Sequence, residues 1–515
     1  MNYILLLETL VFSLFRLRFL MLFFQQKEYV AKWFLKFIFK GGARLVDKKL
    51  TFLLFMLWLF FPLTIYYVSV VPIFFVCFGI KEAYFLKNAK KKLVMTQRVK
   101  RILLVAYVLT IVLAFALSRI SSFLYVIITI QLLPILIVVG NCLLSPIEKN
   151  IQKKFLNEAK EKLEKIKPVV IGITGSFGKT STKHILAHVL SGNLSVLFTP
   201  RSVNTEMGIT RVIRENLMEQ HKYFVVEMGA YFKGSIAKLC KFVNPKHGII
   251  TAVGEAHYEY FKTRETVASA KFELGEWVTK NNGTLIVNNS QIEDRLIPKN
   301  MPMIKVGNGT GVYATDINQM NDKLSFTLCR NGEKYQVVAP IYGLHQVNNI
   351  VLAIEMSLRL GMDMDTILAK LHSLPQINHR LEALKQDGNI MIIDDAFNSN
   401  FEGFKSGLEL LQSLQAGRRI LITPGMVELG KLHNSMHYEI GKIAGKKVDV
   451  ALVVAANRIP TFLKGFKETA SEGTLLMQVK SFSDAKDWTK TNLRAGDVVL
   501  LENDLPDVYE SEFRL

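Results

Sequence analysis

Cysteine is scarce in this sequence, and the few cysteines are scattered. Cys77, Cys142, Cys240 and Cys329 are the only four among 515 residues, and no two of them lie at a short spacing. Disulfide frameworks and structural zinc sites need cysteines in closely spaced pairs. Neither feature is expected here, and the cysteine content fits a reducing compartment around the soluble part of the chain.

Acidic residues are nearly absent from the first third of the chain. Residues 1–168 contain 25 lysines and arginines but only 8 acidic residues, so they carry 17 of the 20 net positive charges. A nucleic-acid-binding protein would place such an excess on a folded face with stacking aromatic side chains. Here the basic residues separate apolar runs, a pattern typical of loops beside an anionic membrane leaflet. No nucleic-acid partner is expected.

Charged residues are missing from the longest apolar runs. Residues 51–80 contain none, and residues 102–140 contain only Arg119. Together with the apolar residues 1–24, these runs predict four or five membrane spans, because one span needs about 20 apolar residues. The run 51–80 is short for two full spans and is interpreted as a hairpin bent at its prolines. An ion path needs ionisable groups at depth, so the pattern favours an anchor over a transporter.

Two basic loops indicate the orientation of these predicted spans. Residues 25–50 and 81–101 are rich in lysine and arginine, and such loops are typical of the cytoplasmic side. The sequence therefore predicts a multi-pass membrane protein. Both loops, and any part of the chain that uses ATP, are expected on the cytoplasmic side, and membrane lipid is expected as a partner.

The segment VVIGITGSFGKTSTKHIL, residues 169–186, has the pattern of a strand, a glycine-rich turn and a helix. Glycines let backbone N–H groups approach phosphate oxygens, the helix start adds positive potential, and a lysine reaches the terminal phosphates. A hydroxyl after that lysine can hold Mg²⁺. The usual motif has a glycine six positions before the lysine, where this chain has Ile173. The segment predicts a nucleotide site formed by Gly175, Ser176, Gly178, Lys179, Thr180 and Ser181.

Two further polar residues follow predicted buried strands. Glu227 comes after Tyr223-Phe224-Val225-Val226, and His257 follows the segment GIITAVGEA. Ligands bind at the carboxyl edge of parallel strands, so both residues are candidate metal ligands beside the phosphate loop. Lys271 lies in an amphipathic helical pattern, and by pattern alone it has the character of a surface lysine.

Ordered segments over about residues 165–515 resemble the Mur ligase family. They are TGSFGKT, NTEMGIT, FVVEMGA, GIITAVGEAHYEYF, VASAKFEL, GLHQVNNIVLAI, HRLEAL, IIDDAFNSN and MVELG. The resemblance is greatest to the members that add D-alanyl-D-alanine to a peptidoglycan precursor peptide. It implies an enzyme that uses ATP and Mg²⁺ to form an amide bond through an acyl phosphate. With the predicted spans, it implies a multi-pass protein of the bacterial cytoplasmic membrane whose catalytic domains lie in the cytoplasm.

The resemblance also assigns roles to residues. Glu227 and Thr180 would bind one Mg²⁺, while His257 and a carbamylated Lys271 would bind a second. Catalysis is thereby assigned to Lys179, Glu227, His257 and Lys271. ATP would contact Asn288 near the adenine, Asp395 at the ribose, and Arg380 when the domains close. The substrate contacts implied by the resemblance are Asn204, Asn398 and Asn400.

Several features depart from the family pattern. The family's N-terminal UDP-binding domain is missing, Pro424-Gly425 replaces Gly-Asp, and residues 498–507 replace the expected Lys-Gly-Ser.

The expected partners are a cell-wall precursor peptide and an amino acid or dipeptide, with the true acceptor and amine left open. A membrane-bound ligase for poly-γ-glutamate or a lipid-linked peptide is the first alternative. A transport ATPase is disfavoured because this chain lacks the Leu-Ser-Gly-Gly-Gln-like signature of the commonest such ATPases. An inactive scaffold is disfavoured because the chain retains the catalytic residues. The oligomeric state is not predicted.

The expected fold class is α/β, preceded by a helical membrane segment. Strands alternate with helices in two successive sets, which is typical of parallel sheets. Between 311 and 340 an antiparallel insert is expected, with Asn331-Gly332 as its hairpin turn. The predicted domains are a membrane anchor at 1–145, a basic helical linker at 146–167, a P-loop-type ATP-binding domain at 168–378 and a Rossmann-like ligase domain at 379–515.

Overall fold

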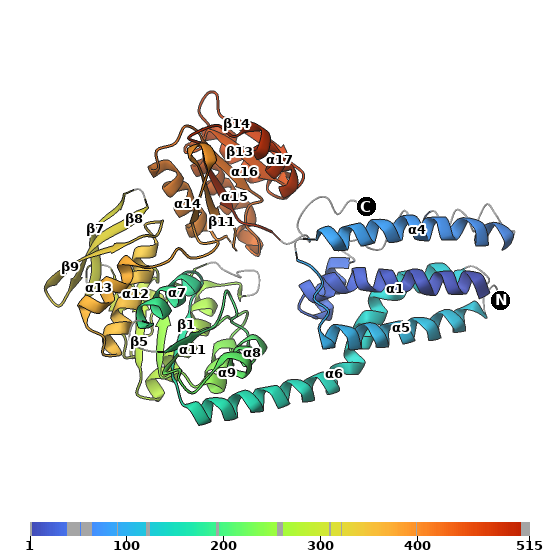
Figure 1. The fold of residues 1–515 in the computed structure, drawn as a ribbon, viewed down its shortest axis with the longest axis horizontal. Helices are drawn as coiled ribbons and strands as arrows, with labels where there is room; N and C mark the ends of the chain where they lie inside the picture. Colours follow the sequence, from blue (N-terminus) through green and yellow to red (C-terminus); the bar gives the residue numbers. More distant parts are fainter. Residues whose placement is uncertain are drawn as a thin grey trace. The chain divides into compact units, whose positions relative to one another are not determined.

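The computed structural model of the chain describes residues 3–38, 52, 64–89, 91–119, 124–191, 195–254, 261–307, 309, 311–320, 322–397 and 399–505. The chain divides into two compact units (Figure 1). One unit comprises Met1–Lys153 with Leu505–Leu515, and the other comprises Lys154–Asp504. The second unit contains two sheets, and it holds every described residue that was predicted to lie in the active site.

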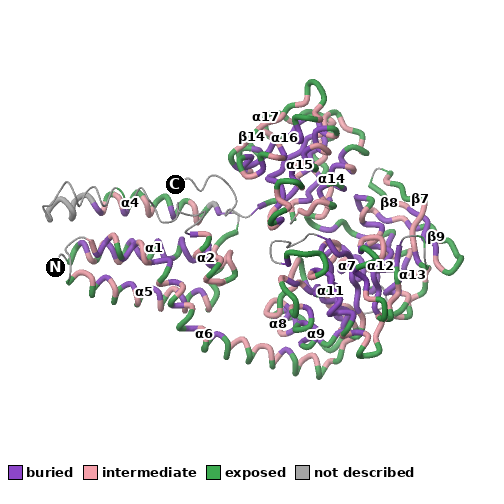
Figure 2. The backbone as a smooth tube through the Cα atoms, turned by 180° about the vertical axis from the view of Figure 1, so that it is seen from behind, coloured by how far each residue is buried: buried purple, intermediate pink, exposed green. Residues whose placement is uncertain are grey.

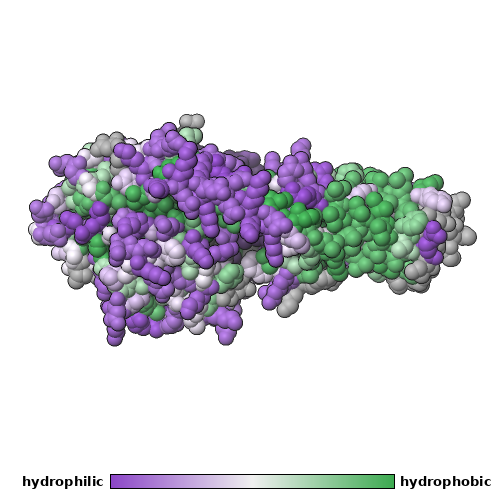
Figure 3. Space-filling view, turned by 90° about the horizontal axis from the view of Figure 1, so that it is seen from below, coloured by the Kyte–Doolittle hydropathy of each residue, from purple (hydrophilic) through white to green (hydrophobic). Residues whose placement is uncertain are grey.

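The N-terminal unit is helical in its described part. Helix α1 packs against α4 and α5, and side chains such as Phe23, Ile102 and Ile137 are fully buried in their common core. Hydrophobic side chains also gather on the surface of this unit (Figure 3). The helices are α1 Tyr3–Gln26, α2 Ala31–Lys36, α4 Thr64–Asn88, α5 Gln97–Ser118 and the first part of α6 Leu124–Ile166.

Two helices of the described residues, α5 and α6, are long and apolar enough to cross a membrane by length and composition. Buried helices of soluble proteins meet the same criterion. The hairpin predicted at 51–80 falls partly outside the described residues. Its described part is a single helix, α4, that continues through Pro72.

A sheet of nine strands forms the centre of the first catalytic domain, counting only the residues that the structure describes. The strand order is β2-β3-β1-β4-β5-β6-β7-β8-β9, and the strands from β2 to β7 are parallel. The strands are β1 Val169–Thr174, β2 Val196–Phe198, β3 Tyr223–Glu227, β4 His247–Ile250, β5 Thr284–Asn288, β6 Ile304–Val306, β7 Val312–Met320, β8 Lys323–Arg330 and β9 Glu333–Ala339.

Helices cover both faces of this sheet, as an α/β fold requires. Helices α7, α12 and α13 contribute to one apolar core, while α8, α9 and α11 contribute to the other. The strands between them are buried (Figure 2). The helices are α7 Lys179–Leu190, α8 Glu206–Asn216, α9 Ser235–Val243, α11 Arg264–Lys280, α12 Gln346–Arg359 and α13 Met364–His372.

The antiparallel insert is confirmed. Strands β7, β8 and β9 pair antiparallel, and Arg330 pairs with Glu333 across the turn. Asn331 and Gly332 both have positive φ, 51° and 85°. A two-residue hairpin turn of this kind needs positive φ at both positions, which Asn-Gly adopts readily.

The second catalytic domain is built on a sheet with the order β10-β11-β15-β12-β13-β14, as far as its described residues extend. Only β10 is antiparallel to its neighbour. The strands are β10 Glu382–Gln386, β11 Ile390–Asp395, β12 Arg419–Thr423, β13 Val450–Val454, β14 Leu475–Val479 and β15 Val498–Glu502. The helices are α14 Phe401–Ser413, α15 His433–Gly445, α16 Pro460–Thr469 and α17 Phe482–Asn492. The predicted α/β fold class is confirmed.

The last part of α6, from residue 154 onward, belongs to the catalytic unit. Glu158 accepts a hydrogen bond from Arg214 Nε at 2.7 Å, and Lys162 Nζ donates to the Arg214 carbonyl at 2.8 Å. The Arg214 guanidinium also lies 3.9 Å from the centre of the Phe155 ring. The basic stretch predicted as a linker is therefore part of a long helix whose end is attached to α8.

Removing the Glu273 carboxylate should destabilise the catalytic unit. Glu273 on α11 accepts hydrogen bonds from Gly234 N at 2.5 Å and Ala237 N at 2.9 Å, at the start of α9. Because these donors would lose a charged acceptor, Glu273→Ala should lower the free energy of unfolding in urea by about 1–3 kcal/mol. Glu276→Ala changes an exposed residue of the same helix and serves as control. Equal effects of the two substitutions would contradict the capping role.

Candidate active site

The turn after β1 is shaped by two glycines that cannot be replaced. Gly175 has a φ of 152°, and a Cβ there would lie 2.0 Å from Thr251 Oγ1. Gly178 has a φ of 81°, and a Cβ there would lie 2.6 Å from Asn349 Oδ1. Both positions therefore need glycine for conformation and for space. Thr251 and Asn349, which press on the turn, were not identified from the sequence.

Helix α7 begins at Lys179, directly after this turn, and the backbone N–H groups at the start of a helix are suited to binding phosphate. Lys179 Nζ donates to the carbonyls of Gly175 at 2.7 Å and Ser176 at 3.2 Å. Burial lowers the pKa of Lys179 to about 8, while the nearby Glu227 carboxylate opposes that shift. Thr182 Oγ1 donates to Asn349 Oδ1 at 3.1 Å and holds α7 against α12.

Glu227 ends β3 beside the turn and is only 1% exposed. Its Oε2 accepts hydrogen bonds from Thr180 Oγ1 at 3.0 Å and Lys183 Nζ at 2.9 Å. Its Oε1 accepts one from Asn204 Nδ2 at 3.1 Å. Burial acts to raise the pKa of Glu227, but Lys183 and Lys179 outweigh it, and the pKa is lowered overall. Glu227 is therefore an anion at neutral pH.

The side-chain oxygen atoms of Thr180 and Glu227 are suitable ligands for Mg²⁺. A hydroxyl and a carboxylate lie 3.0 Å apart, both nearly buried, and Mg²⁺ prefers oxygen ligands and usually shares them with substrate phosphates. The sequence predicted this pair. It did not identify Lys183, whose only signal was its position four residues after Lys179 on the same helix face.

Lys271 is buried rather than on the surface, with 3% of the residue exposed. Burial lowers its pKa well below the usual value, and the nearby Lys179 adds to this effect. No ion pair to Lys271 occurs within the described residues. The candidate ligand His257 lies outside those residues, in the segment 255–260, so its placement beside Lys271 stays a prediction.

A pocket adjoins the phosphate loop and collects residues of both catalytic domains. From the first domain it is lined by Gly178, Thr180 and Asn288, and from the second by Arg380 and Asp395. Ser181 and Asn400 also line it. These residues, predicted to contact ATP or substrate, are thus brought together, although their roles stay predictions. Asn398 lies outside the described residues.

The structure gives three of the pocket residues additional contacts. Asn400 Oδ1 accepts a hydrogen bond from Gly403 N at 3.0 Å and caps α14. The Arg380 guanidinium lies 4.8 Å from the centre of the Phe397 ring. His345 Nδ1 lies 2.6 Å from Ser406 Oγ. Burial, assisted by the charge of Arg380, lowers the pKa of His345 to about 4, so this ring is neutral at pH 7.

Two buried carboxyl groups lie side by side at the carboxyl ends of two neighbouring interior strands of the second sheet. Asp395 and Glu502 are paired in register on β11 and β15, and they are 9% and 0% exposed. Burial raises the pKa of Asp395 to about 6 although Arg380 opposes it. Burial and the neighbouring Asp395 raise the pKa of Glu502 well above its usual value. Glu502 accepts a hydrogen bond from Ser399 Oγ.

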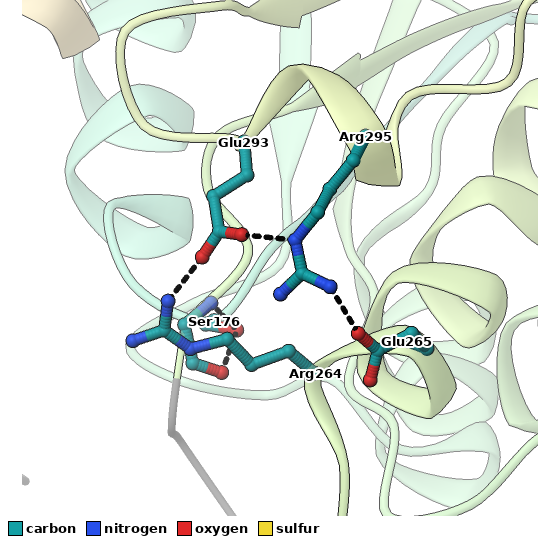
Figure 4. Close-up of polar contacts among 6 residues, drawn as sticks. Ser176, Arg264, Glu265, Glu293 and Arg295 are labelled. Atoms are coloured by element: carbon teal, nitrogen blue, oxygen red, sulfur yellow. Dashed lines mark hydrogen bonds and ion pairs between the residues drawn. The ribbon is translucent and has the colours of Figure 1, made fainter.

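An exposed ion-pair network supports the start of α11, the helix that carries Lys271. Glu293 lies between Arg264 and Arg295 (Figure 4). Arg295 Nη1 also pairs with Glu265 at 2.7 Å. Because exposed ion pairs contribute about 0–1 kcal/mol each, this network orients the helix start more than it stabilises the domain.

Comparison with known proteins agrees with this arrangement. The model of the Mur ligase middle domain matches residues 173–357, and the model of the Mur ligase glutamate ligase domain matches residues 379–502. The UDP-N-acetylmuramoyl-tripeptide–D-alanyl-D-alanine ligase of Bacillus subtilis is 30% identical over 375 residues, covering 68% of this chain and 78% of that ligase. The chain belongs to the Mur ligase family. As a Mur ligase it is an ATP-dependent enzyme that forms carbon–nitrogen bonds.

Solved structures of Mur ligases share the fold. The MurF ligase of Thermotoga maritima in complex with ADP superimposes with a TM-score of 0.61 at 25% identity, covering 70% of this chain and 82% of that one. MurF from Acinetobacter baumannii gives a TM-score of 0.61 at 24% identity, over 68% and 77% of the two chains. The recognition of the family from sequence segments, with greatest likeness to MurF, is thereby confirmed.

The predicted localisation, a multi-pass protein of the bacterial cytoplasmic membrane, is wrong. The MurF enzymes to which this Mur ligase is similar are soluble cytoplasmic enzymes, and only two helices in the described part of the chain meet the length and composition criterion. The prediction rested on length and composition, which cannot by themselves place a helix in a membrane, because buried helices of soluble proteins meet the same criterion. Some apolar side chains of α1, α5 and α6 share one core, while others, such as Leu104 and Val112, are exposed.

The two buried carboxylates of the second domain predict a dependence of stability on pH. Because their pKa values are raised on folding, the folded protein binds protons that the unfolded chain releases above about pH 4. Stability should therefore fall as the pH rises through about 6 and beyond. Glu502→Gln removes one of these charges and should stabilise the protein at pH 8 more than at pH 5 in urea unfolding.

Glu472→Gln is the matched control for this experiment, because Glu472 is exposed in the same domain. It should shift stability equally little at both pH values. A Glu502→Gln variant that is destabilised to the same extent at pH 5 and pH 8 would show that Glu502 is not a source of the pH dependence.

Proposed function

We propose that this Mur ligase adds D-alanyl-D-alanine to UDP-N-acetylmuramoyl-tripeptide, the reaction named for its Bacillus subtilis relative. The observation that carries the proposal is the cluster of Lys179, Thr180 and Glu227 beside a pocket that also presents Arg380 and Asp395. Such a cluster suits transfer of a phosphoryl group to a carboxylate, which positioning and charge stabilisation accelerate.

In the proposed mechanism the phosphate loop and Lys179 hold the β- and γ-phosphates of ATP. Thr180 and Glu227 would hold Mg²⁺, which would supply positive charge beside the phosphates. The substrate carboxylate attacks the γ-phosphorus, releasing ADP and forming an acyl phosphate. The amine of the incoming dipeptide attacks the acyl carbon and loses a proton, and phosphate leaves to give the amide. Arg380 and Asp395, from the second domain, enclose the pocket and keep water from the acyl phosphate.

Lys271 is proposed to act as a carbamate. A neutral amine can add CO₂, and burial favours the neutral form of the Lys271 amine because it lowers the pKa of this group. The resulting carbamate would present anionic oxygen atoms, which suit a second Mg²⁺ together with His257. The absence of an ion pair to Lys271 among the described residues supports this proposal.

A different incoming amine is the second candidate. The two departures from the family pattern meet in space, because Asn503 Nδ2 donates to the Gly425 carbonyl at 2.7 Å. Arg458 Nη1 donates to the neighbouring Pro424 carbonyl at 3.1 Å. Two altered segments that are joined by a hydrogen bond favour a coordinated change in the domain that receives the amine. For the substrate that supplies the carboxylate, the alternative acceptor is poly-γ-glutamate or a lipid-linked peptide.

The ligation itself can be measured by mass. The full chain with Mg-ATP, UDP-N-acetylmuramoyl-tripeptide and D-alanyl-D-alanine should yield a product heavier by one dipeptide. Lys179→Ala should reduce its rate at least about a hundredfold, because the charge on the transferred phosphate loses its partner. Lys222→Ala, an exposed lysine of the same domain, should keep the rate. ATP turnover only with another amine or a lipid-linked acceptor would reject the assigned substrates.

The carbamate can be tested through CO₂. In buffer freed of CO₂ the rate of ligation should fall, and added bicarbonate should restore it. Lys271→Arg, which keeps a cation but cannot form the carbamate, should be inactive with or without bicarbonate. A ¹³C signal of a carbamate is expected in wild-type protein given labelled bicarbonate and not in this variant. A rate and a spectrum that ignore bicarbonate would contradict the proposal.

A further inference from the structure

Lys183 is a fully buried cation in the centre of the candidate metal site. Its side chain is 0% exposed, and its Nζ lies 2.9 Å from Glu227 Oε2. The same ammonium donates to the carbonyl of Arg201, which fixes it from a second direction. Lys183 stands one helical turn after Lys179 on α7, so the two lysines approach the site from one helix face.

The oxygen that Lys183 contacts is also the one that Thr180, the other candidate metal ligand, contacts. Glu227 Oε2 accepts hydrogen bonds from both Lys183 and Thr180, whereas Asn204 occupies the other oxygen. A buried carboxylate without a counter-charge is strongly unfavourable. Lys183 supplies that counter-charge within the fold, so Glu227 can stay ionised and oriented without a metal ion.

We propose that Lys183 is a positioning residue, the built-in counter-ion of Glu227, which makes tight Mg²⁺ binding depend on the nucleotide phosphates. A cation on the same oxygen repels a divalent ion through the low-dielectric interior. The phosphates of ATP bring negative charge that offsets this repulsion, so metal and nucleotide bind together. The inference rests on the proposed role of Glu227 as a metal ligand.

This arrangement has a consequence for the order of events at the site. A site that bound free Mg²⁺ tightly would hold the ion before ATP arrives, with its coordination positions already occupied by water and protein atoms. A site weakened by Lys183 stays open to the Mg-ATP complex. Lys183 also fixes the Glu227 carboxylate, to which Thr180 and Asn204 are hydrogen-bonded.

The test is metal binding to the nucleotide-free full chain, with Mn²⁺ as the probe and electron paramagnetic resonance to count free ions. Lys183→Met removes the charge and keeps the length of the side chain. It should bind Mn²⁺ at least about tenfold more tightly than the wild type. Its melting temperature without metal should be lower than that of the wild type, and Mn²⁺ should restore it. Lys183→Arg keeps the charge and should show neither effect.

Arg418→Met is the matched control, because Arg418 forms an ion pair with the buried Asp497 at 2.6 Å in the other catalytic domain. It should lower the melting temperature without any rescue by Mn²⁺. Unchanged or weaker Mn²⁺ binding by Lys183→Met would overturn the proposal. These readouts do not involve ligation, so they stay informative if the assigned substrates prove wrong.

If Lys183→Met does not fold, a double variant still decides the matter. Lys183→Met with Glu227→Gln removes both charges and should fold, without any stabilisation by Mn²⁺. Recovery of folding in the double variant supports the counter-ion role. Failure of the double variant to fold would show that Lys183 serves packing rather than charge balance, and would overturn the proposal.

Discussion

The burial of one negative charge constrains the whole phosphate end of the first catalytic domain. Glu227 is 1% exposed at the end of β3, where an unpaired carboxylate would cost several kcal/mol. Two elements meet this demand: helix α7 brings Thr180 and Lys183, and the loop before α8 brings Asn204. The Thr199 hydroxyl accepts from the backbone N–H of Glu227 at 3.1 Å and fixes the end of the strand. The same contacts hold the phosphate loop beside the sheet.

In the second domain the pKa values of the buried carboxyl groups are shifted in the opposite direction from that of Glu227. Asp395 and Glu502 also stand at the carboxyl ends of parallel strands, and Arg380 is the positive charge near them. Burial outweighs the effect of Arg380 on their pKa values, which are raised. The first domain presents a carboxylate paired with a lysine, which suits metal and phosphate. The other presents a group whose charge depends on pH.

Two segments that depart from the pattern of the resembled family meet in the second domain. Gly425 and Asn503 are 78 residues apart in the chain and share a hydrogen bond, next to Glu502 on β15. Segments that are distant in sequence are thus in contact in the domain that is proposed to receive the amine.

The amino-acid sequence by itself determined the alternation of strands and helices, the Asn331-Gly332 hairpin and the phosphate loop. These features depend on local periodicity, on turn chemistry and on glycines, which are local properties. It also placed Glu227 at a strand end. Only the tertiary structure decided that Lys183 and Lys271 are buried, and that Gly425 meets Asn503. The apolar N-terminal runs misled the prediction of localisation because length and composition alone do not identify a membrane span. Lys183, Lys271 and Gly425 could not be placed from the sequence because burial and contact depend on partners that lie far away in the chain, and a pattern of neighbours along the sequence does not contain them.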